Sequence, residues 1–195
     1  MKSTTRFGKS FFSICSATAL MLMAGMAQMA SALEPYEGTA TLCAVDMTGV
    51  TQVVKGKKGI TYIYNQKLLF RIDSDNILMH GWEVLTSNTK AKPDGGGYSW
   101  GEALLTPDGY EGVATLVDNF KFPVRQADNI TGTYIGTGDL VGVTVDYALI
   151  PAAPPSLPLD ACVGMPWACV PDDPTTCDPV PAGVAGYFMS GWVND

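Results

Sequence analysis

The fold is most clearly indicated by the segment Asp139-Leu140-Val141-Gly142-Val143-Thr144-Val145-Asp146-Tyr147-Ala148-Leu149-Ile150. Its large apolar residues recur at every second position, so they share one face of an extended chain. A helix would scatter the same valines around its circumference, and β-branched side chains favour the pleated surface of a sheet. The pattern therefore predicts a strand over 139–150, with an apolar face formed by Val141, Val143, Val145, Tyr147 and Leu149.

Shorter alternating runs precede this strand along the chain. They cover 36–45, 50–54, 60–64, 67–72, 77–86, 97–106, 112–117, 120–124 and 130–135. Turn-forming residues separate them at 65–66, 73–76, 92–97 and 106–109, and the last two turns contain Pro-Asp-Gly, in which glycine accepts a positive φ. Short strands joined by tight turns, without helices between them, predict an all-β fold. We expect an antiparallel β-barrel of about eight strands, with a β-sandwich as the alternative.

The composition changes after position 150. Nine prolines fall between 151 and 181, and proline cannot donate to a β-ladder, so this segment is not a central strand. It is expected to form an irregular C-terminal arm. The apolar run over 184–193 is expected to be a final strand or a packed terminus.

Cysteine usage indicates disulfides. Apart from Cys15 near the N-terminus, the chain has four cysteines, Cys43, Cys162, Cys169 and Cys177. An even number in an exported chain predicts two disulfides, with three possible pairings, and a link from the arm to the barrel through Cys43. The spacings lack the C-x2-C pair typical of zinc sites, so no metal site is expected.

The first 32 residues are typical of a secretory signal peptide. Three basic residues precede an apolar run from about 11 to 29, and Ala30-Ser31-Ala32 forms a small-x-small cleavage site. The alternative is an uncleaved membrane anchor, because the run is long enough to span a bilayer. The expected division is a signal peptide over 1–32, a barrel domain over 33–150 and a disulfide-tied arm over 151–195. We expect a soluble protein that is secreted or periplasmic.

The charge of the expected mature chain limits its partners. Cleavage would remove three basic residues and leave nine Lys and Arg against nineteen Asp and Glu, a net charge of about −10. Such a surface repels phosphate backbones and anionic lipids. We therefore expect no nucleic-acid partner and, after cleavage, no membrane association.

Motifs for catalysis are weak. Gly97-Tyr98-Ser99-Trp100-Gly101 matches the G-x-S-x-G nucleophile elbow, but the next residues continue as a strand, and the lone histidine, His80, precedes the serine. Glu83 and Glu102 could pair as glycosidase carboxylates, although nothing in the sequence brings them together. No catalytic residue and no cofactor are assigned.

Aromatic residues supply the richest binding chemistry. Indole and phenol rings on strands can line an apolar pocket or belong to an ordinary core. His80 is the side chain whose usual pKa lies nearest neutrality, so it is a further candidate for ligand contact. The candidate ligand-binding residues are His80, Trp82, Trp100 and Tyr134.

The glycine-patterned stretch Gly132-Thr133-Tyr134-Ile135-Gly136-Thr137-Gly138-Asp139-Leu140-Val141-Gly142-Val143 resembles a strand pair of allene oxide cyclase-like and dirigent-like barrels. Leu105-Thr106-Pro107-Asp108-Gly109 is loosely similar to a turn in that group. The resemblance implies an antiparallel barrel of about eight strands with an apolar interior. It transfers no catalytic residue, and the proline- and cysteine-rich arm departs from the pattern.

These observations favour a non-catalytic exported barrel that binds a small apolar or aromatic ligand. One alternative is a structural or interaction protein of an envelope or extracellular assembly, with a protein partner. A second is a cyclase-like or dirigent-like enzyme that steers a reactive intermediate by the shape of its pocket. An outer-membrane barrel is disfavoured by the proline-rich ending and the irregular alternation.

Overall fold

The computed structural model describes residues 33–55, 59–124, 129–152, 157–171, 175–181, 183 and 185–195. The signal peptide expected over 1–32 lies outside these residues, so its cleavage stays a prediction. Within the described part of the chain, no helix is long and apolar enough to cross a bilayer.

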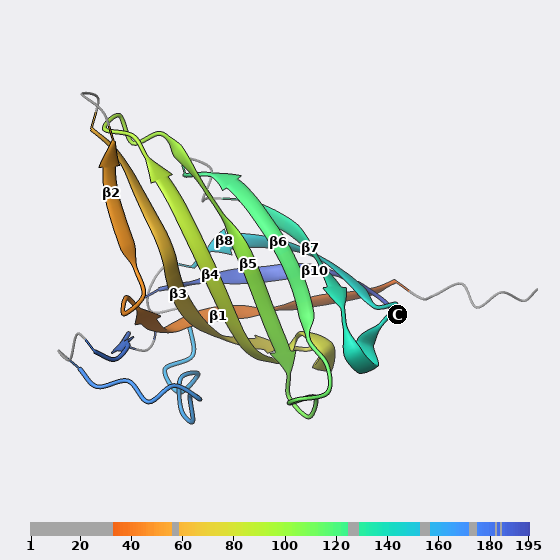
Figure 1. Ribbon diagram of the computed structural model, residues 1–195. Coiled ribbons are helices and arrows are strands. Elements are labelled where there is room, and N and C mark those ends of the chain that lie inside the picture. The colour runs from red at the N-terminus through yellow and green to blue at the C-terminus, as the bar shows by residue number, and fades with distance from the viewer. Residues whose placement is uncertain are drawn as a thin grey trace, which may run out of the picture. The chain divides into compact units, whose positions relative to one another are not determined.

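Eight antiparallel strands close into a barrel (Figure 1). In hydrogen-bonding order they are β3 (Ile60–Ser74), β4 (Gly81–Ala91), β5 (Gly97–Pro107), β6 (Leu116–Pro123), β7 (Ile130–Gly136), β8 (Thr144–Pro151), β10 (Gly186–Asn194) and β1 (Glu34–Asp46), and β1 pairs again with β3. Two short strands extend the sheet: β2 (Thr51–Lys55) pairs with β3, and β9 (Asp178–Pro179) pairs with β1. The predicted antiparallel barrel is confirmed, in place of the sandwich alternative.

Two pairs of predicted strands are single strands in the structure. The runs 60–64 and 67–72 form β3 without a break, and the turn expected between them is a bulge, where the pairing with β4 shifts. Asn65 adopts a φ of 61° at this bulge, a conformation that asparagine tolerates better than most residues. The runs 112–117 and 120–124 are likewise replaced by a turn over 111–113 and one strand, β6.

Two other strands begin later than the alternation suggested. Residues Ile77–Met79 form a 3-10 helix, η1, whose Asn76 cap accepts a hydrogen bond of 3.0 Å from the Leu78 N–H, and β4 follows it. A second 3-10 helix, η3 (Gly138–Leu140), precedes β8. The predicted strand over 139–150 therefore starts only at Thr144, and Val141 is exposed instead of facing the core.

The last strand, β10, lies between β8 and β1 in the barrel wall. The barrel thus includes residues that the expected division assigned to the arm, and the arm is an insertion between β8 and β10. Two disulfides, Cys43–Cys162 and Cys169–Cys177, select one of the three possible pairings. The first joins β1 to the arm, which confirms the predicted link through Cys43.

The barrel wall has apolar side chains packed on both faces. The inner core combines residues from all eight strands, among them Tyr36, Phe70, Leu105, Val145 and Met189. A second cluster lies on the outer face, where the arm covers β1, β3 and β4. Its members are Ala44, Leu69 and Cys177, with Trp82, Val84, Met165, Trp167 and Cys169 packed against them.

Candidate functional site

The barrel interior contains a cavity of about 210 Å³. Successive residues of a strand point to opposite faces of the sheet, so every second residue of β4 faces inward. Four β4 residues line the cavity, and β3, β5, β6, β7, β8, β10 and β1 supply the remaining walls. The lining residues are Ala40, Gln66, Leu68, Phe70, Glu83, Leu85, Ser87, Thr89, Ser99, Ala103, Phe120, Phe122, Ile130, Tyr134, Tyr147, Leu149 and Tyr187.

Glu83 places a carboxyl group at this cavity. Its side chain is nearly inaccessible to bulk solvent, with 6% of its surface exposed, and the Tyr134 hydroxyl donates a hydrogen bond of 3.0 Å to Glu83 Oε1. Removal from water disfavours the charged form, and this desolvation raises the pKa of Glu83 to about 7. The Tyr134 hydrogen bond acts in the opposite direction, and the nearby Asp118 charge adds to the increase.

A second buried carboxyl group lies beside the first. Asp118 on β6 is 8% exposed and accepts a hydrogen bond of 2.6 Å from the Tyr147 hydroxyl. Burial raises the pKa of Asp118 as well. The rings of Tyr134 and Tyr147 contact each other with centroids 4.9 Å apart, so the two carboxyl–phenol pairs form one connected polar group within the apolar core.

This arrangement defines what the interior can do chemically. A carboxyl group with a pKa near 7 exists in both forms at neutral pH, so it can accept or donate a hydrogen bond and can exchange a proton. The serine and threonine hydroxyls of Ser87, Thr89 and Ser99 add further polar groups at the cavity wall. In the described part of the chain, no group of three or more His, Cys, Asp or Glu residues is placed to hold a metal ion.

Of the four ligand-binding residues expected from the sequence, the structure brings Tyr134 alone into the cavity wall. Trp100 lies on the outer face of β5, where its ring contacts Tyr98 and Tyr64 at centroid distances of 5.4 and 6.3 Å. Trp82 lies on the outer face of β4, against the arm-covered cluster and 5.3 Å from the Arg71 guanidinium.

His80 belongs to a charged cluster outside the cavity. The Arg71 guanidinium donates to His80 Nε2 over 2.6 Å, because arginine can only donate, and it also forms a bidentate pair with Asp108 at 2.7 and 2.9 Å. His80 Nδ1 lies 3.7 Å from Asp73 Oδ1. These contacts join β3, the residue before β4 and the turn after β5.

The G-x-S-x-G match has no elbow geometry. Residues 97–107 continue as one strand, β5, and no helix follows Ser99. Instead, the Ser99 hydroxyl lies 2.9 Å from the Thr89 hydroxyl across the strand pair. Glu83 and Glu102 do not converge either, because Glu83 faces the interior and Glu102 is exposed.

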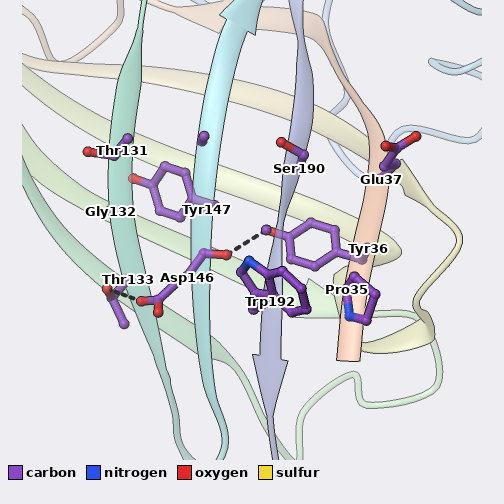
Figure 2. Close-up of a pocket in the computed structure, with 12 residues that line it drawn as sticks. Pro35, Tyr36, Glu37, Thr131, Gly132, Thr133, Asp146, Tyr147, Ser190 and Trp192 are labelled. Atoms are coloured by element: carbon purple, nitrogen blue, oxygen red, sulfur yellow. Dashed lines mark hydrogen bonds between the residues drawn. The ribbon is translucent and has the colours of Figure 1, made fainter. Parts of the chain in front are cut away.

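An open groove of about 650 Å³ lies on the other side of the barrel wall, and Figure 2 shows its lining. A cross-strand row forms its base: Gly132 pairs with Tyr147, Tyr147 with Gly191, and Gly191 with Tyr36. On the interior side of this row, the Tyr147 phenol lies over Gly132 and the Tyr36 hydroxyl lies near Gly191, so a side chain at position 132 would collide with the Tyr147 hydroxyl. The Tyr36 hydroxyl donates to the Asp146 carbonyl over 3.3 Å, and Trp192 is half exposed at the rim.

Sequence reasoning missed Glu83 and Asp118 as a buried pair. In β4 the residues on either side of Glu83 are Trp82 and Val84, so an apolar pattern alone favours their face, and not that of Glu83, as the buried one. The signal in the sequence was that Glu83 and Asp118 each lie on a strand face whose other nearby residues are apolar or small. Only the register between distant strands shows that Tyr134 and Tyr147 reach these acids.

In comparisons with known proteins, no family model, no curated protein and no solved structure matches this chain. The relationship to allene oxide cyclase-like and dirigent-like barrels therefore stays a prediction.

Proposed function

We propose that this protein is a non-catalytic binding protein that holds a small apolar or aromatic ligand inside the barrel. The observation that carries the proposal is the interior cavity, whose wall is mainly apolar and aromatic with a few polar groups. Ligand sites in proteins commonly combine these two features, because apolar contacts supply affinity and a few polar groups fix orientation. Eight-stranded barrels have room inside for one small ligand.

The size of the cavity limits the ligand. An engineered apolar cavity of about 150 Å³ is large enough to bind benzene. The 210 Å³ cavity of this barrel therefore suits a ligand with one aromatic ring and a short substituent. Larger compounds, such as steroids or long-chain lipids, would require the wall to move.

A matched pair of substitutions tests the binding site. Ala103 lines the cavity, whereas Ala148 lines the outer groove, so Ala103→Phe fills the first and Ala148→Phe fills the second. We expect Ala103→Phe to abolish calorimetric binding of benzyl alcohol and Ala148→Phe to leave it unchanged. Ala103→Leu repeats the test with a smaller side chain, and circular dichroism verifies the fold of each variant. Binding that survives both Ala103 variants would exclude the cavity as the site.

We also infer that the protein is exported and acts in the periplasm or outside the cell. Two disulfides support this inference, because disulfides persist in oxidising compartments. The leader pattern over 1–32 supports it independently. The intact mass of protein recovered outside the cytosol should correspond to a chain that starts at Leu33. Recovery of a chain that still carries Met1 would contradict cleavage.

A second candidate function is that of an interaction protein in an extracellular or envelope assembly. It is favoured by large apolar side chains on the outer faces of β8 and β10, where Ile150 pairs with Phe188 and Trp192 follows on the same face. Their exposed fractions are 56%, 45% and 51%, respectively. If this surface binds a partner, Phe188→Lys should remove the interaction and Ala103→Phe should not. The reverse result would favour the interior as the functional site.

A further inference from the structure

The two buried carboxyl groups of the barrel interior have no cationic partner within the cavity. Among the described residues that line the cavity there is no lysine, arginine or histidine. Each carboxyl group receives one phenol hydrogen bond, from Tyr134 to Glu83 and from Tyr147 to Asp118. A phenol stabilises a carboxylate by hydrogen bonding, but it leaves the negative charge uncompensated.

An uncompensated buried charge is unfavourable, because transfer from water to a protein interior costs several kcal/mol per ion unless a counter-ion is near. Filling the same positions with apolar residues would often be neutral or stabilising. The negative charge of a carboxyl group at a cavity is therefore one that a cationic ligand could neutralise. Glu83 is such a group, and Asp118, which accepts the Tyr147 hydroxyl hydrogen bond, acts on Glu83 as a nearby negative charge.

The remaining walls suit an organic cation better than a metal ion. Phe120 and Phe122 stack with ring centroids 5.6 Å apart, and Tyr134 and Tyr147 present two further rings. Aromatic faces attract ammonium groups through their quadrupoles and also pack against an aromatic ring of the ligand. In the described part of the chain, no three His, Cys, Asp or Glu side chains are grouped closely enough to hold a metal ion.

We propose that the ligand of the barrel interior is a small primary amine with one aromatic ring, whose ammonium group pairs with Glu83 while its ring packs against Phe120 and Phe122. This inference rests on the proposed function, since it names the chemical class of the ligand for the same cavity. The net negative charge of the chain would also raise the local concentration of such cations.

Three probes of nearly equal size separate charge from shape. Benzylamine is a cation at pH 8, benzyl alcohol is neutral and benzoate is an anion. By calorimetry at pH 8, we expect the wild-type protein to bind benzylamine at least about tenfold more tightly than benzyl alcohol and to reject benzoate. Glu83→Gln preserves the shape of the side chain and should reduce the preference for benzylamine to less than about twofold. Glu102→Gln, on the exposed face of β5, is the control and should change nothing.

Proton release supplies a second readout. Because the Glu83 carboxyl is partly protonated near neutral pH, pairing with an ammonium group should expel its proton. At pH 6.5, the binding heat of benzylamine should therefore vary with the ionisation enthalpy of the buffer in the wild-type protein and not in Glu83→Gln.

The outcomes separate this inference from the proposed function. If benzyl alcohol binds in the interior as tightly as benzylamine, the amine proposal is overturned and the binding function stands. If benzylamine binds equally well to Ala103→Phe, it binds outside the cavity by attraction to the acidic surface, which also overturns the proposal. If none of the three probes binds, both the amine proposal and the proposed function fail.

Discussion

The hydroxyl of Tyr134 on β7 donates a hydrogen bond of 3.0 Å to Glu83 Oε1 on β4, although the two residues are 51 positions apart in the chain. This bond favours the ionised carboxyl group and so counteracts part of the increase that burial causes in its pKa. Tyr134→Phe should therefore raise the pKa of Glu83 further. Removing a partner from a buried polar group typically destabilises a protein by about 1–3 kcal/mol.

The effect of Tyr134→Phe can be measured by nuclear magnetic resonance titration of the Glu83 carboxyl carbon and by urea unfolding. A pKa of Glu83 that stays the same or decreases in the variant would show that the bond does not stabilise the carboxylate. Tyr98→Phe removes a phenol hydroxyl from the outer surface of β5 and provides the control.

The raised pKa of Glu83 predicts a pH dependence of stability. Between the unfolded value of 4.5 and the folded value of about 7, the folded protein binds more protons than the unfolded chain. The free energy of unfolding must then fall as the pH rises through this window, and this carboxyl group contributes a loss of about 3 kcal/mol. Asp118 contributes in the same direction, because its pKa is also raised.

Glu83→Gln should flatten this profile, because glutamine does not titrate and can still accept the Tyr134 hydrogen bond. Urea unfolding at pH 4.5 and at pH 7.5 measures the difference, and the exposed substitution Glu102→Gln should leave the profile as in the wild type. A wild-type stability that increases from pH 4.5 to 7.5, and does so equally in Glu83→Gln, would contradict the burial of this charge.

The row of alternating glycines and tyrosines predicts a steric effect at position 132. A methyl group at Gly132 would overlap the Tyr147 ring and hydroxyl, and this hydroxyl donates the hydrogen bond to Asp118. Gly132→Ala should therefore lower the free energy of unfolding by about 1–3 kcal/mol, as overpacking does. Gly49→Ala is the matched control, because no atom lies within 4 Å of a methyl group there. Equal stability of the two variants would show that Tyr147 can move aside.

The two disulfides should contribute unequally to stability. Cys43–Cys162 closes a separation of 119 residues and Cys169–Cys177 one of 8. In the chain-entropy description, the first constrains the unfolded chain by about 5 kcal/mol and the second by about 2–3 kcal/mol. Replacing each pair by serine and measuring unfolding by urea tests this order.

The denatured, unreduced wild-type protein should show no free thiol among the four, and four reactive thiols would refute both bridges.

The fold could be predicted from local patterns because strands of a barrel alternate in a regular way. Val145 and Tyr147 face the interior as the alternation indicated, and the turn at Pro107-Asp108-Gly109 follows β5 directly. Boundaries were less predictable. The bulge at Asn65 resembles a turn in sequence. The 3-10 helix η3 was predicted as part of a strand, because its buried Leu140 belongs to a continuous apolar run.

Tyr134 was the one sequence-predicted residue that lines the cavity, and the rest of the site could not be predicted for a physical reason. Where the arm covers β4, both faces of the strand are packed, so Trp82 and Val84 fill the outer face and Glu83 and Ser87 the inner one. Hydrophobic alternation specifies the register of a strand only when one face of the sheet is buried and the other is exposed to solvent. The carboxyl–phenol pairs also depend on contacts between strands far apart in sequence, which a local pattern does not contain.

Methyl chemical shifts during a titration with benzyl alcohol show whether the barrel interior holds a small aromatic ligand. The methyl groups of Leu68, Leu85 and Leu149 line the cavity, whereas Ile150 lies on the outer face beside Phe188. Ring currents from a bound ligand should shift the three leucine signals in a saturable way, leave Ile150 unchanged, and disappear in Ala103→Phe. Saturable shifts confined to Ile150, or leucine shifts of equal size in Ala103→Phe and the wild type, would show that the ligand does not bind in the interior.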